Sequence, residues 1–321
     1  MSFSKQVKEE LANHWSVARH CQIAEIAAML SMLGELHITN EESVAKATGA
    51  TNERNSIKQS LQISTENSAV AKKYFTLLQK TFKIKAIMSL RCNVHIVTVQ
   101  DEDIEQVLKA TKCSETLLEV RSIVMQRACC KRAFIRGAFL ASGSISAPEK
   151  GYHFEIVCPT RQKAEQLQEV MNSFALEAKI ILRKHAYIVY LKESTQIVDV
   201  LNVMEAHVAL MELENVRILK EVRNQINRKV NCETANINKT VSASLKQKED
   251  ILYIRDYQGF QKLPESLQNM AEVRLSHPDA SLKELGELMN PPVGKSGVNH
   301  RLRKLSMIAE DMRAKQGGNY D

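Results

Sequence analysis

Apolar and polar residues follow one another along this chain in two matching series of segments. Two stretches rich in small apolar residues, 23–36 (IAEIAAMLSMLGEL) and 134–145 (FIRGAFLASGSI), are typical of buried helices. Each helix is predicted to end at a glycine, Gly34 or Gly143, because glycine readily adopts the left-handed backbone found directly after helices. The two glycines lie about a hundred residues apart, which is the size of one small α/β unit.

The segments that follow the two predicted helices share one order, namely strand, helix, two strands and helix. Strands are expected where apolar and polar residues alternate, and helices where apolar residues recur every three or four positions. In the first half these segments are 60–65, 67–82 with Thr65 or Asn67 as its cap, 83–90, 93–99 and a helix beginning near Asp101. In the second half they are 152–158, 160–174, 178–183, 187–191 and 194–204. The repeated order predicts a duplicated α+β domain.

The last third of the chain has a different pattern. Residues 222–244 are rich in asparagine and lack a sustained apolar stripe, which indicates a linker that is helical at most in part. From Ile251 onward the apolar spacing is helical throughout, and 315–321 is expected to be a frayed tail. We therefore expect a first repeat at 1–125, a second repeat at 126–221, a linker at 222–245 and an all-α domain at 246–321.

Two short helices are predicted near the C-terminus. Ser281 and Glu284 have the spacing of a capping box at the start of the first helix, which must end before Pro291. The second helix is expected over 297–308. Its apolar stripe comprises Val298, Leu302, Leu305 and Ile308.

Polar residues able to contact DNA lie at the start and on the exposed face of this second helix. They are Lys295, Ser296, Asn299, His300, Arg301, Arg303 and Lys304. Arginine can pair with guanine edges and asparagine with adenine edges, whereas lysine and serine more often hold phosphates. The alternative is a solvated basic face on an ordinary helical hairpin, and the turn is longer than in the tightest helix-turn-helix motifs. We favour a helix-turn-helix that binds double-stranded DNA.

Composition adds little to this prediction. A net charge of +7 and a pI near 8.9 suit a polyanionic partner, but many proteins without one are as basic. No apolar run reaches the roughly 18 residues of a membrane span, and the N-terminus lacks the apolar core of a signal peptide. We expect a cytoplasmic, nucleoid-associated protein with no membrane partner.

The seven cysteines are scattered, apart from the adjacent pair Cys129 and Cys130. None forms a C-x-x-C pair, and the single C-x-x-H, from Cys92 to His95, has no second pair to complete a zinc site. We predict reduced thiols that fill small positions, with no metal and no cofactor. A redox or metal role is the alternative.

The two motif helices resemble those of the LAGLIDADG homing endonucleases. This resemblance implies a tandem αββαββα repeat whose two motif helices pack closely through small residues. The family's acidic residue before the final glycine binds the catalytic metal, and here Leu33 and Ser142 occupy those positions. Neither side chain supplies the anionic oxygen that Mg²⁺ prefers. The resemblance therefore implies a scaffold without catalytic residues or nuclease activity, so that the chain is not an enzyme.

The chain as a whole resembles the WhiA family of bacterial sporulation-type transcription regulators. Three segments carry the resemblance: 129–146 (CCKRAFIRGAFLASGSIS), 214–241 (ENVRILKEVRNQINRKVNCETANINKTV) and 281–305 (SLKELGELMNPPVGKSGVNHRLRKL). It implies a LAGLIDADG-like scaffold followed by a helix-turn-helix, and a role in DNA binding, cell division and chromosome segregation. Residues 46–60 are more polar than expected of a strand in this family, so the first strand is the least defined element.

Basic residues on the scaffold allow two interpretations. The sheet faces of homing endonucleases straddle DNA, which implies phosphate contacts from Lys83, Lys85, Arg91, Lys179, Arg183, Lys184 and His185. Solvated strand edges kept basic to discourage aggregation explain these residues equally well. Two interpretations also remain for Lys131, Arg132 and Arg136. They can contact DNA, or they can form ion pairs with Glu119 or Glu149.

Two other functions compete with DNA-binding regulation. The first is an endonuclease that uses acidic residues outside the motif, such as Glu35 or Asp101. The second is an interaction protein whose scaffold binds a second regulator or a division protein. DNA binding and protein binding are compatible with each other.

Overall fold

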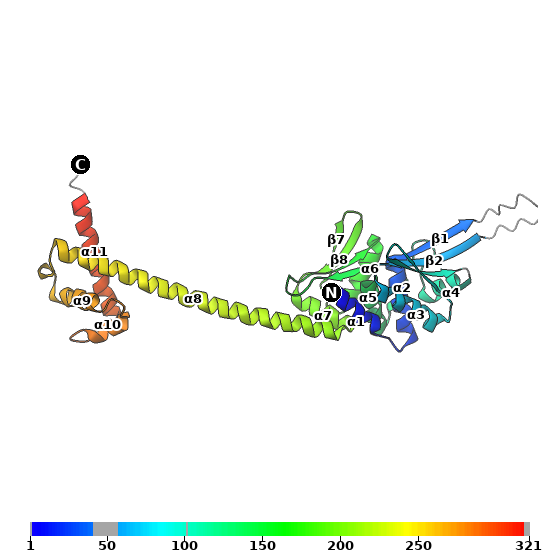
Figure 1. The fold of residues 1–321 in the computed structure, drawn as a ribbon, viewed down its shortest axis with the longest axis horizontal. Helices are drawn as coiled ribbons and strands as arrows, with labels where there is room; N and C mark the ends of the chain where they lie inside the picture. The colour runs from blue at the N-terminus through cyan, green and yellow to red at the C-terminus, as the bar shows by residue number, and fades with distance from the viewer. Residues whose placement is uncertain (1, 41–56, 101, 318–321) are drawn as a thin grey trace, which may run out of the picture. The chain divides into compact units, whose positions relative to one another are not determined.

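The computed structural model describes residues 2–40, 57–100 and 102–317, and it divides into two compact units (Figure 1). The first unit comprises Met1–Lys220 and the second Glu221–Asp321. Each unit is described separately below.

The first unit contains two copies of an αββαββα motif, as the resemblance to the LAGLIDADG family implies. The first copy consists of α2 (Arg19–Leu33), β1 (Gly34–Asn40), β2 (Ile57–Thr65), α3 (Ser68–Phe82), β3 (Ile87–Arg91), β4 (Val94–Gln100) and α4 (Glu102–Thr111). The second consists of α5 (Ala128–Ser142), β5 (Gly143–Ile145), β6 (Phe154–Cys158), α6 (Arg161–Asn172), β7 (Lys179–Arg183), β8 (Ala186–Leu191) and α7 (Ser194–Met204). The spacing alone missed the first strand of each copy, β1 and β5. Helix α1 (Phe3–Asn13) precedes the first copy, and the 3-10 turn η1 (Ser122–Met125) joins the two.

Each copy forms an antiparallel four-stranded sheet, with strand orders β1-β2-β4-β3 and β5-β6-β8-β7. Alternate residues of the central strands, such as Val97 and Val99 in β4, are buried beneath the helices. Asn67, one of the two predicted candidates, caps α3. Its side chain accepts hydrogen bonds from the backbone N–H groups of Ala69 and Val70. Within the polar stretch 46–60, β2 begins at Ile57, and the remainder lies outside the described residues, as does Asp101.

Helices α2 and α5 pack against each other at the centre of the first unit (Figure 1). Small residues allow this approach, as the resemblance to the LAGLIDADG family implies: Ala27, Ala28, Ala138 and Ala141 are buried. A Cβ atom on Gly137 would lie 2.5 Å from the carbonyl oxygen of Glu25 and 3.0 Å from the Cβ of Ala28. The interface therefore requires glycine at position 137.

Gly34 and Gly143 do end the two helices, but the predicted reason for a glycine there, a left-handed backbone, is wrong. Their φ angles are −71° and −82°, so neither backbone is left-handed, and each helix passes directly into an extended strand. Space is the physical reason for glycine at both positions. A Cβ on Gly34 would lie 2.7 Å from the Cδ1 of Leu118, and one on Gly143 would lie 2.7 Å from the carbonyl oxygen of Phe139.

A network of buried charges joins α2, α3 and α5. The carboxylate of Glu25 lies 3.2 Å from Lys73 Nζ and 3.3 Å from Arg136 Nη2, and Arg136 Nη1 lies 2.6 Å from the carboxylate of Glu205. Burial lowers the pKa of Lys73, while the charge of Glu25 acts in the opposite direction. Arg136 thus neither faces outward nor pairs with the two glutamates suggested by the sequence.

The predicted linker at 222–245 is helical along its whole length and belongs to α8 (His207–Tyr257). Its residues are almost entirely exposed, so a buried stripe is absent from this part of the helix. Exposed apolar residues nevertheless recur at helical spacing at Ile226, Val230, Ile237 and Val241. In the sequence, this spacing is the one feature that indicates a helix in a segment otherwise dominated by polar residues.

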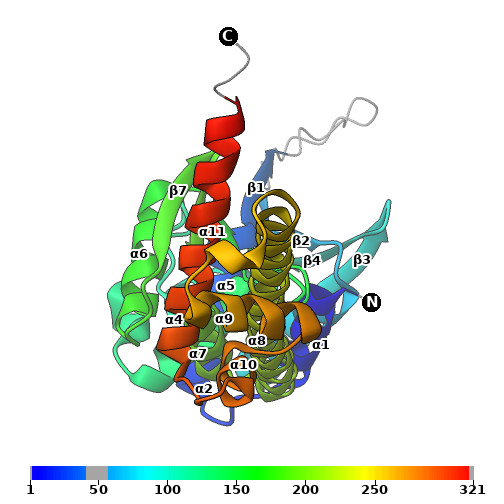
Figure 2. The same ribbon diagram turned by 90° about the vertical axis from the view of Figure 1, so that its left-hand side faces the viewer.

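The second unit is all-α, as predicted, and gathers α9 (Glu265–Ser276), α10 (Leu282–Leu288) and α11 (Lys295–Gly317) against the C-terminal part of α8 (Figure 2). The 3-10 turn η2 (Phe260–Lys262) precedes α9. Helix α11 begins two residues before the predicted start and extends past the predicted end, where Ala309 and Met312 continue its apolar stripe, to Gly317, the third of the residues expected to fray. None of the described helices is both long and apolar enough to cross a membrane.

Candidate nucleic-acid interface

The predicted capping box fixes the start of α10. Ser281 Oγ accepts from the backbone N–H of Glu284 at 3.3 Å, and the carboxylate of Glu284 accepts from the backbone N–H of Ser281 at 2.7 Å. The hydrogen bond from the Ser281 backbone lowers the pKa of the Glu284 carboxyl. Arg274 holds the preceding loop by donating to the carbonyl of Ala280 at 2.7 Å.

The turn between α10 and α11 packs closely on Gly286. The backbone N–H of Val293 donates to the carbonyl of Gly286 at 2.9 Å. A Cβ on Gly286 would also lie 3.3 Å from Cγ2 of Val298, the first buried residue of α11. The absence of a side chain at Gly286 therefore sets the distance between the two helices of the motif.

Helix α11 has one buried and one exposed face. Val298, Leu302 and Leu305 are buried, and Ile308 packs partly buried against the same core, so the predicted stripe is confirmed. The residues predicted to contact DNA lie elsewhere on the helix: Lys295, Ser296, Asn299, His300, Arg303 and Lys304 are exposed, and Arg301 is half-buried. No residue in the described part of the chain forms an ion pair with Lys295, Arg301, Arg303 or Lys304. Their charges are available to a ligand.

A cleft of about 540 Å³ lies beside the N-terminal part of α11. Its lining includes two predicted residues, Lys295 and Asn299, together with Lys239 from α8 and Lys283 from α10. Neither of these two lysines was predicted from the sequence. Lys239 fell in the predicted linker, and only the continuous helicity of α8 places it next to the motif.

Leu33 and Ser142, to which the resemblance assigns the positions of the LAGLIDADG family's metal-binding acids, are the last residues of α2 and α5. Leu33 packs half-buried against the core, and Ser142 Oγ donates to the carbonyl of Val157 at 2.7 Å. Neither side chain carries a negative charge, so neither supplies the carboxylate ligand that a catalytic Mg²⁺ usually takes. Glu35 follows directly in β1, where its carboxylate is exposed and lies 3.4 Å from His37 Nε2.

The predicted basic residues of the scaffold are exposed but spread over several elements. Arg91 ends β3 and, by register, lies on the sheet face opposite the buried Val97 and Val99. In the other sheet Lys179 and Arg183 share the corresponding outer face, where Arg183 Nη1 lies 3.7 Å from the carboxylate of Glu155. Lys184 and His185 form the turn between β7 and β8, and Lys83 and Lys85 lie between α3 and β3.

Apolar residues accompany these cations on both outer faces. Ile87 and Ile96 share the outer face of the first sheet with Arg91, and Val157 and Ile181 share that of the second sheet with Arg183. About half of the surface of Ile87 and Ile181 is exposed to solvent. The outer faces of the sheets are therefore mixed surfaces, in contrast to the basic and polar face of α11.

Family models cover most of the chain. The model described as the WhiA LAGLIDADG-like domain matches residues 43–129 and 131–223, and the one described as the WhiA C-terminal HTH domain matches 226–309. The chain is similar to a probable cell division protein WhiA of Lachnoclostridium phytofermentans, with 52% identity over 98% of this chain and 100% of the relative. The corresponding protein of Desulforamulus reducens is 46% identical, over 98% and 97% of the two chains.

A solved structure supports the fold over nearly the same length. Full-length DUF199/WhiA of Thermotoga maritima matches 97% of this chain and 99% of its own chain, with a TM-score of 0.57 and 24% sequence identity. At this level of identity the match supports the arrangement of helices and strands.

Proposed function

The chain belongs to the WhiA family, and on this premise we propose that it is a non-catalytic DNA-binding regulator that acts in cell division. Two features support the proposal: the unpaired basic and polar face of α11, and the replacement of the nuclease carboxylates by Leu33 and Ser142. Relatives named as probable cell division proteins support the biological role. Transcription regulation and chromosome segregation are the processes through which we propose that it acts.

The exposed face of α11 is the observation that carries the proposal. A helix-turn-helix places its second helix in the major groove with N-terminal residues at the base edges. Asn299 and Arg303 are exposed on this helix four residues apart and lie on one side of it, where they can reach neighbouring bases. Lys295, Ser296 and Lys304 are suited to phosphates, which fix the register of the helix on the duplex.

Single substitutions on α11 test this assignment. Bound fragments are first selected from sheared host genomic DNA with the full-length chain, and their affinities are then measured. Arg303→Ala, Arg301→Ala and Asn299→Ala are each expected to weaken binding by about 1–3 kcal/mol, because each removes a base contact. Arg255→Ala is the matched control, since Arg255 belongs to the same unit but pairs with Asp256 at 2.9 Å. Unchanged affinity in all three variants would contradict the recognition-helix assignment.

The absence of nuclease activity has a separate test. Full-length chain incubated with supercoiled plasmid and Mg²⁺ is expected to leave the plasmid intact, because neither Leu33 nor Ser142 supplies the carboxylate that would hold the metal that activates water. Nicking that a chelator abolishes and that Glu35→Gln removes would instead establish an active endonuclease.

The proposed role in division requires a link between DNA sites and genes. A genome-wide map of bound DNA is expected to place the protein at discrete sites near division or segregation genes. The same map with Arg303→Ala is expected to lose these sites. If the sites persist, a scaffold that is recruited by a second regulator or a division protein becomes the better explanation.

A further inference from the structure

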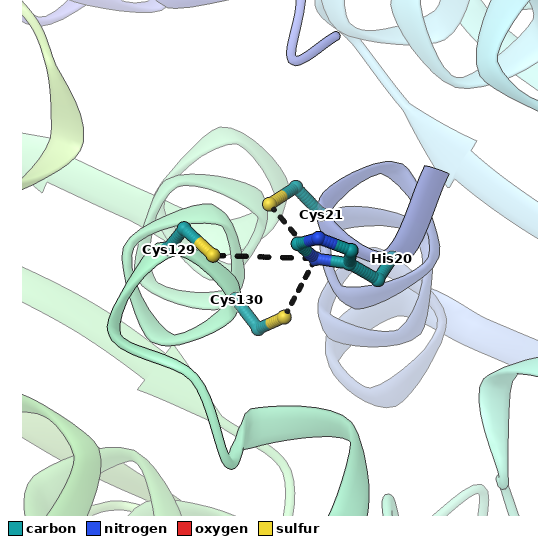
Figure 3. A group of neighbouring side chains, drawn as sticks. All are labelled: His20, Cys21, Cys129 and Cys130. Atoms are coloured by element: carbon teal, nitrogen blue, oxygen red, sulfur yellow. Dashed lines mark hydrogen bonds between the residues drawn. The ribbon is translucent and has the colours of Figure 1, made fainter. Parts of the chain in front are cut away.

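Four potential metal ligands converge at one end of the α2–α5 pair (Figure 3). His20 and Cys21 belong to the first turn of α2, and Cys129 and Cys130 belong to the first turn of α5. The ligand atoms, one imidazole nitrogen and three sulfurs, all lie within 4.8 Å of one another. The cluster is formed by tertiary packing, since the two pairs of ligands come from different repeats.

The pseudo-symmetry of the two repeats explains this convergence. His20 and Cys129, Cys21 and Cys130, and the glycines that end the two helices are each separated by 109 positions. The two pairs therefore occupy equivalent positions on the two motif helices. Because these helices pack closely, their first turns bring both pairs to one point.

The distances fit tetrahedral coordination. With a Zn–S bond of about 2.3 Å and a Zn–N bond of about 2.0–2.1 Å, the sulfur and nitrogen ligands of a tetrahedral ion lie roughly 3.5 Å apart. His20 Nδ1 lies 3.2 Å from the sulfur of Cys130, 3.3 Å from that of Cys21 and 4.0 Å from that of Cys129. One nitrogen therefore has three sulfur neighbours at distances that bracket the tetrahedral value.

We propose that His20, Cys21, Cys129 and Cys130 form a Cys₃His site that binds one Zn²⁺ ion. Thiolate and imidazole ligands in tetrahedral geometry favour zinc over the hard cations that prefer oxygen. On binding, the three thiols each release a proton to solvent, and the neutral imidazole binds through Nδ1. The resulting Zn²⁺(thiolate)₃ centre carries a net charge of −1.

The surroundings of the cluster suit such a centre. Cys21 and Cys130 are buried and pack with Ala24 and Ala133, whereas Cys129 is exposed, which leaves a route for the ion. Both helix N-termini direct their positive dipole ends at the thiolates.

An arginine beside the cluster can balance its charge. Arg127, an exposed residue directly before α5, has its Nη1 atom 3.4 Å from His20 Nε2. When Nδ1 ligates zinc, Nε2 carries the imidazole proton and no longer accepts a hydrogen bond. The guanidinium then turns from His20 to the negative sulfurs.

The site is structural in character. Four protein ligands fill the coordination sphere, whereas catalytic zinc sites keep one position for water. It also lies at the N-terminal ends of the motif helices, about 20 Å along the helix axis from Leu33 and Ser142. Zinc bound here would join the two repeats, and this role does not depend on DNA binding by α11.

A disulfide is the competing interpretation of this cluster. Two oxidised cysteines would leave the third thiol and His20 without a role. The zinc site uses all four residues and accounts for the imidazole nitrogen at their centre.

Metal analysis of the full-length chain tests the proposal. Protein purified under reducing conditions is expected to contain about one zinc ion per chain, as a closed four-ligand site requires. Cys21→Ser and Cys130→Ser are each expected to lose it. Cys113→Ser and Cys158→Ser are the matched controls, because both thiols are buried in the same unit outside the cluster. His20→Cys is expected to retain zinc, because four thiolates also bind it tetrahedrally.

Cobalt substitution provides a test that needs no variant to fold. The wild-type chain with Co²⁺ in place of zinc is expected to show thiolate-to-cobalt charge-transfer bands and the intense visible bands of tetrahedral Co²⁺. A wild-type chain that is purified without zinc and gives no such bands would overturn the proposal. So would zinc retained by a folded Cys21→Ser chain, or a disulfide among these cysteines detected by mass spectrometry in the reduced preparation.

Discussion

Arg136 in α5 and Arg303 in α11 show how differently the two units use a positive charge. Arg136 is 1% exposed and is held by the carboxylates of Glu25 and Glu205 at 3.3 and 2.6 Å and by the hydroxyl of Ser16 at 2.6 Å. Arg303 is exposed and has no ion-pair partner among the described residues. Charge in the first unit holds helices together, whereas charge on α11 is left free for a ligand.

The same contrast separates the sheets from the helix-turn-helix. The outer faces of both sheets mix single cations with exposed apolar residues, and Arg183 is already paired with Glu155. Helix α11 exposes Lys295, Arg303 and Lys304, and Lys295 lines a cleft that contains further lysines. This difference leads us to assign most of the DNA affinity to the second unit.

Removing the Arg136 side chain is expected to lower the free energy of unfolding of the first unit, and this loss is the largest of the expected effects. Arg136→Ala leaves the buried carboxylate of Glu25 with Lys73 as its one cation among the described residues, and loss of a partner in such a network costs about 3–5 kcal/mol. The single tryptophan, Trp15, lies in the first unit, so its fluorescence during urea unfolding reports on that unit alone.

The control for Arg136 is an exposed arginine in the same unit. Arg161→Ala removes a surface pair with Glu165 at 2.7 Å and is expected to leave the free energy of unfolding nearly unchanged, because solvent screens exposed pairs. Equal losses of stability in the two variants would show that the buried network around Arg136 stabilises the unit no more than a surface ion pair does.

Removing the cap of α10 is expected to have a smaller effect, confined to the second unit. Ser281→Ala loses the hydrogen bond to the backbone of Glu284 and is expected to cost about 1 kcal/mol. Faster hydrogen exchange of α10 amides measures this loss. The Trp15 transition is expected to stay unchanged, and a shift in it would show that the two units unfold together.

The elements that local pattern determines could be predicted from the sequence. The helices and the last three strands of each repeat, the cap at Asn67 and the stripe of α11 follow from spacing within a few residues, whereas β1 and β5, which directly follow the motif helices, were missed. The helical continuity of 222–245 was missed because polar residues, asparagine above all, dominate the segment and obscure the helical spacing of its few apolar residues.

Features that depend on tertiary contacts could not be predicted. Gly137 is required by the backbone of Glu25 in α2, which is distant in sequence, and Arg136 finds its partners in α2 and after α7. The His20 and Cys129 ligands lie 109 positions apart, so no motif spacing links them. Aligning the two repeats on their glycines is the one signal that relates these residues before a structure is known.

The smallest effect is expected from the basic residues of the sheet faces. Each phosphate contact that is lost reduces the slope of log affinity against log salt by about 0.9. Lys304→Ala on α11 is expected to produce this change, whereas Arg91→Ala and Arg183→Ala are expected to leave both slope and affinity unchanged, because these side chains lie on mixed, partly paired surfaces. Titrating the selected genomic fragments over a range of salt concentrations measures all three variants. If the slope also falls in the two sheet variants, the first unit makes phosphate contacts with DNA. DNA binding is then shared by both units, and the contrast between Arg136 and Arg303 does not extend to the units as wholes.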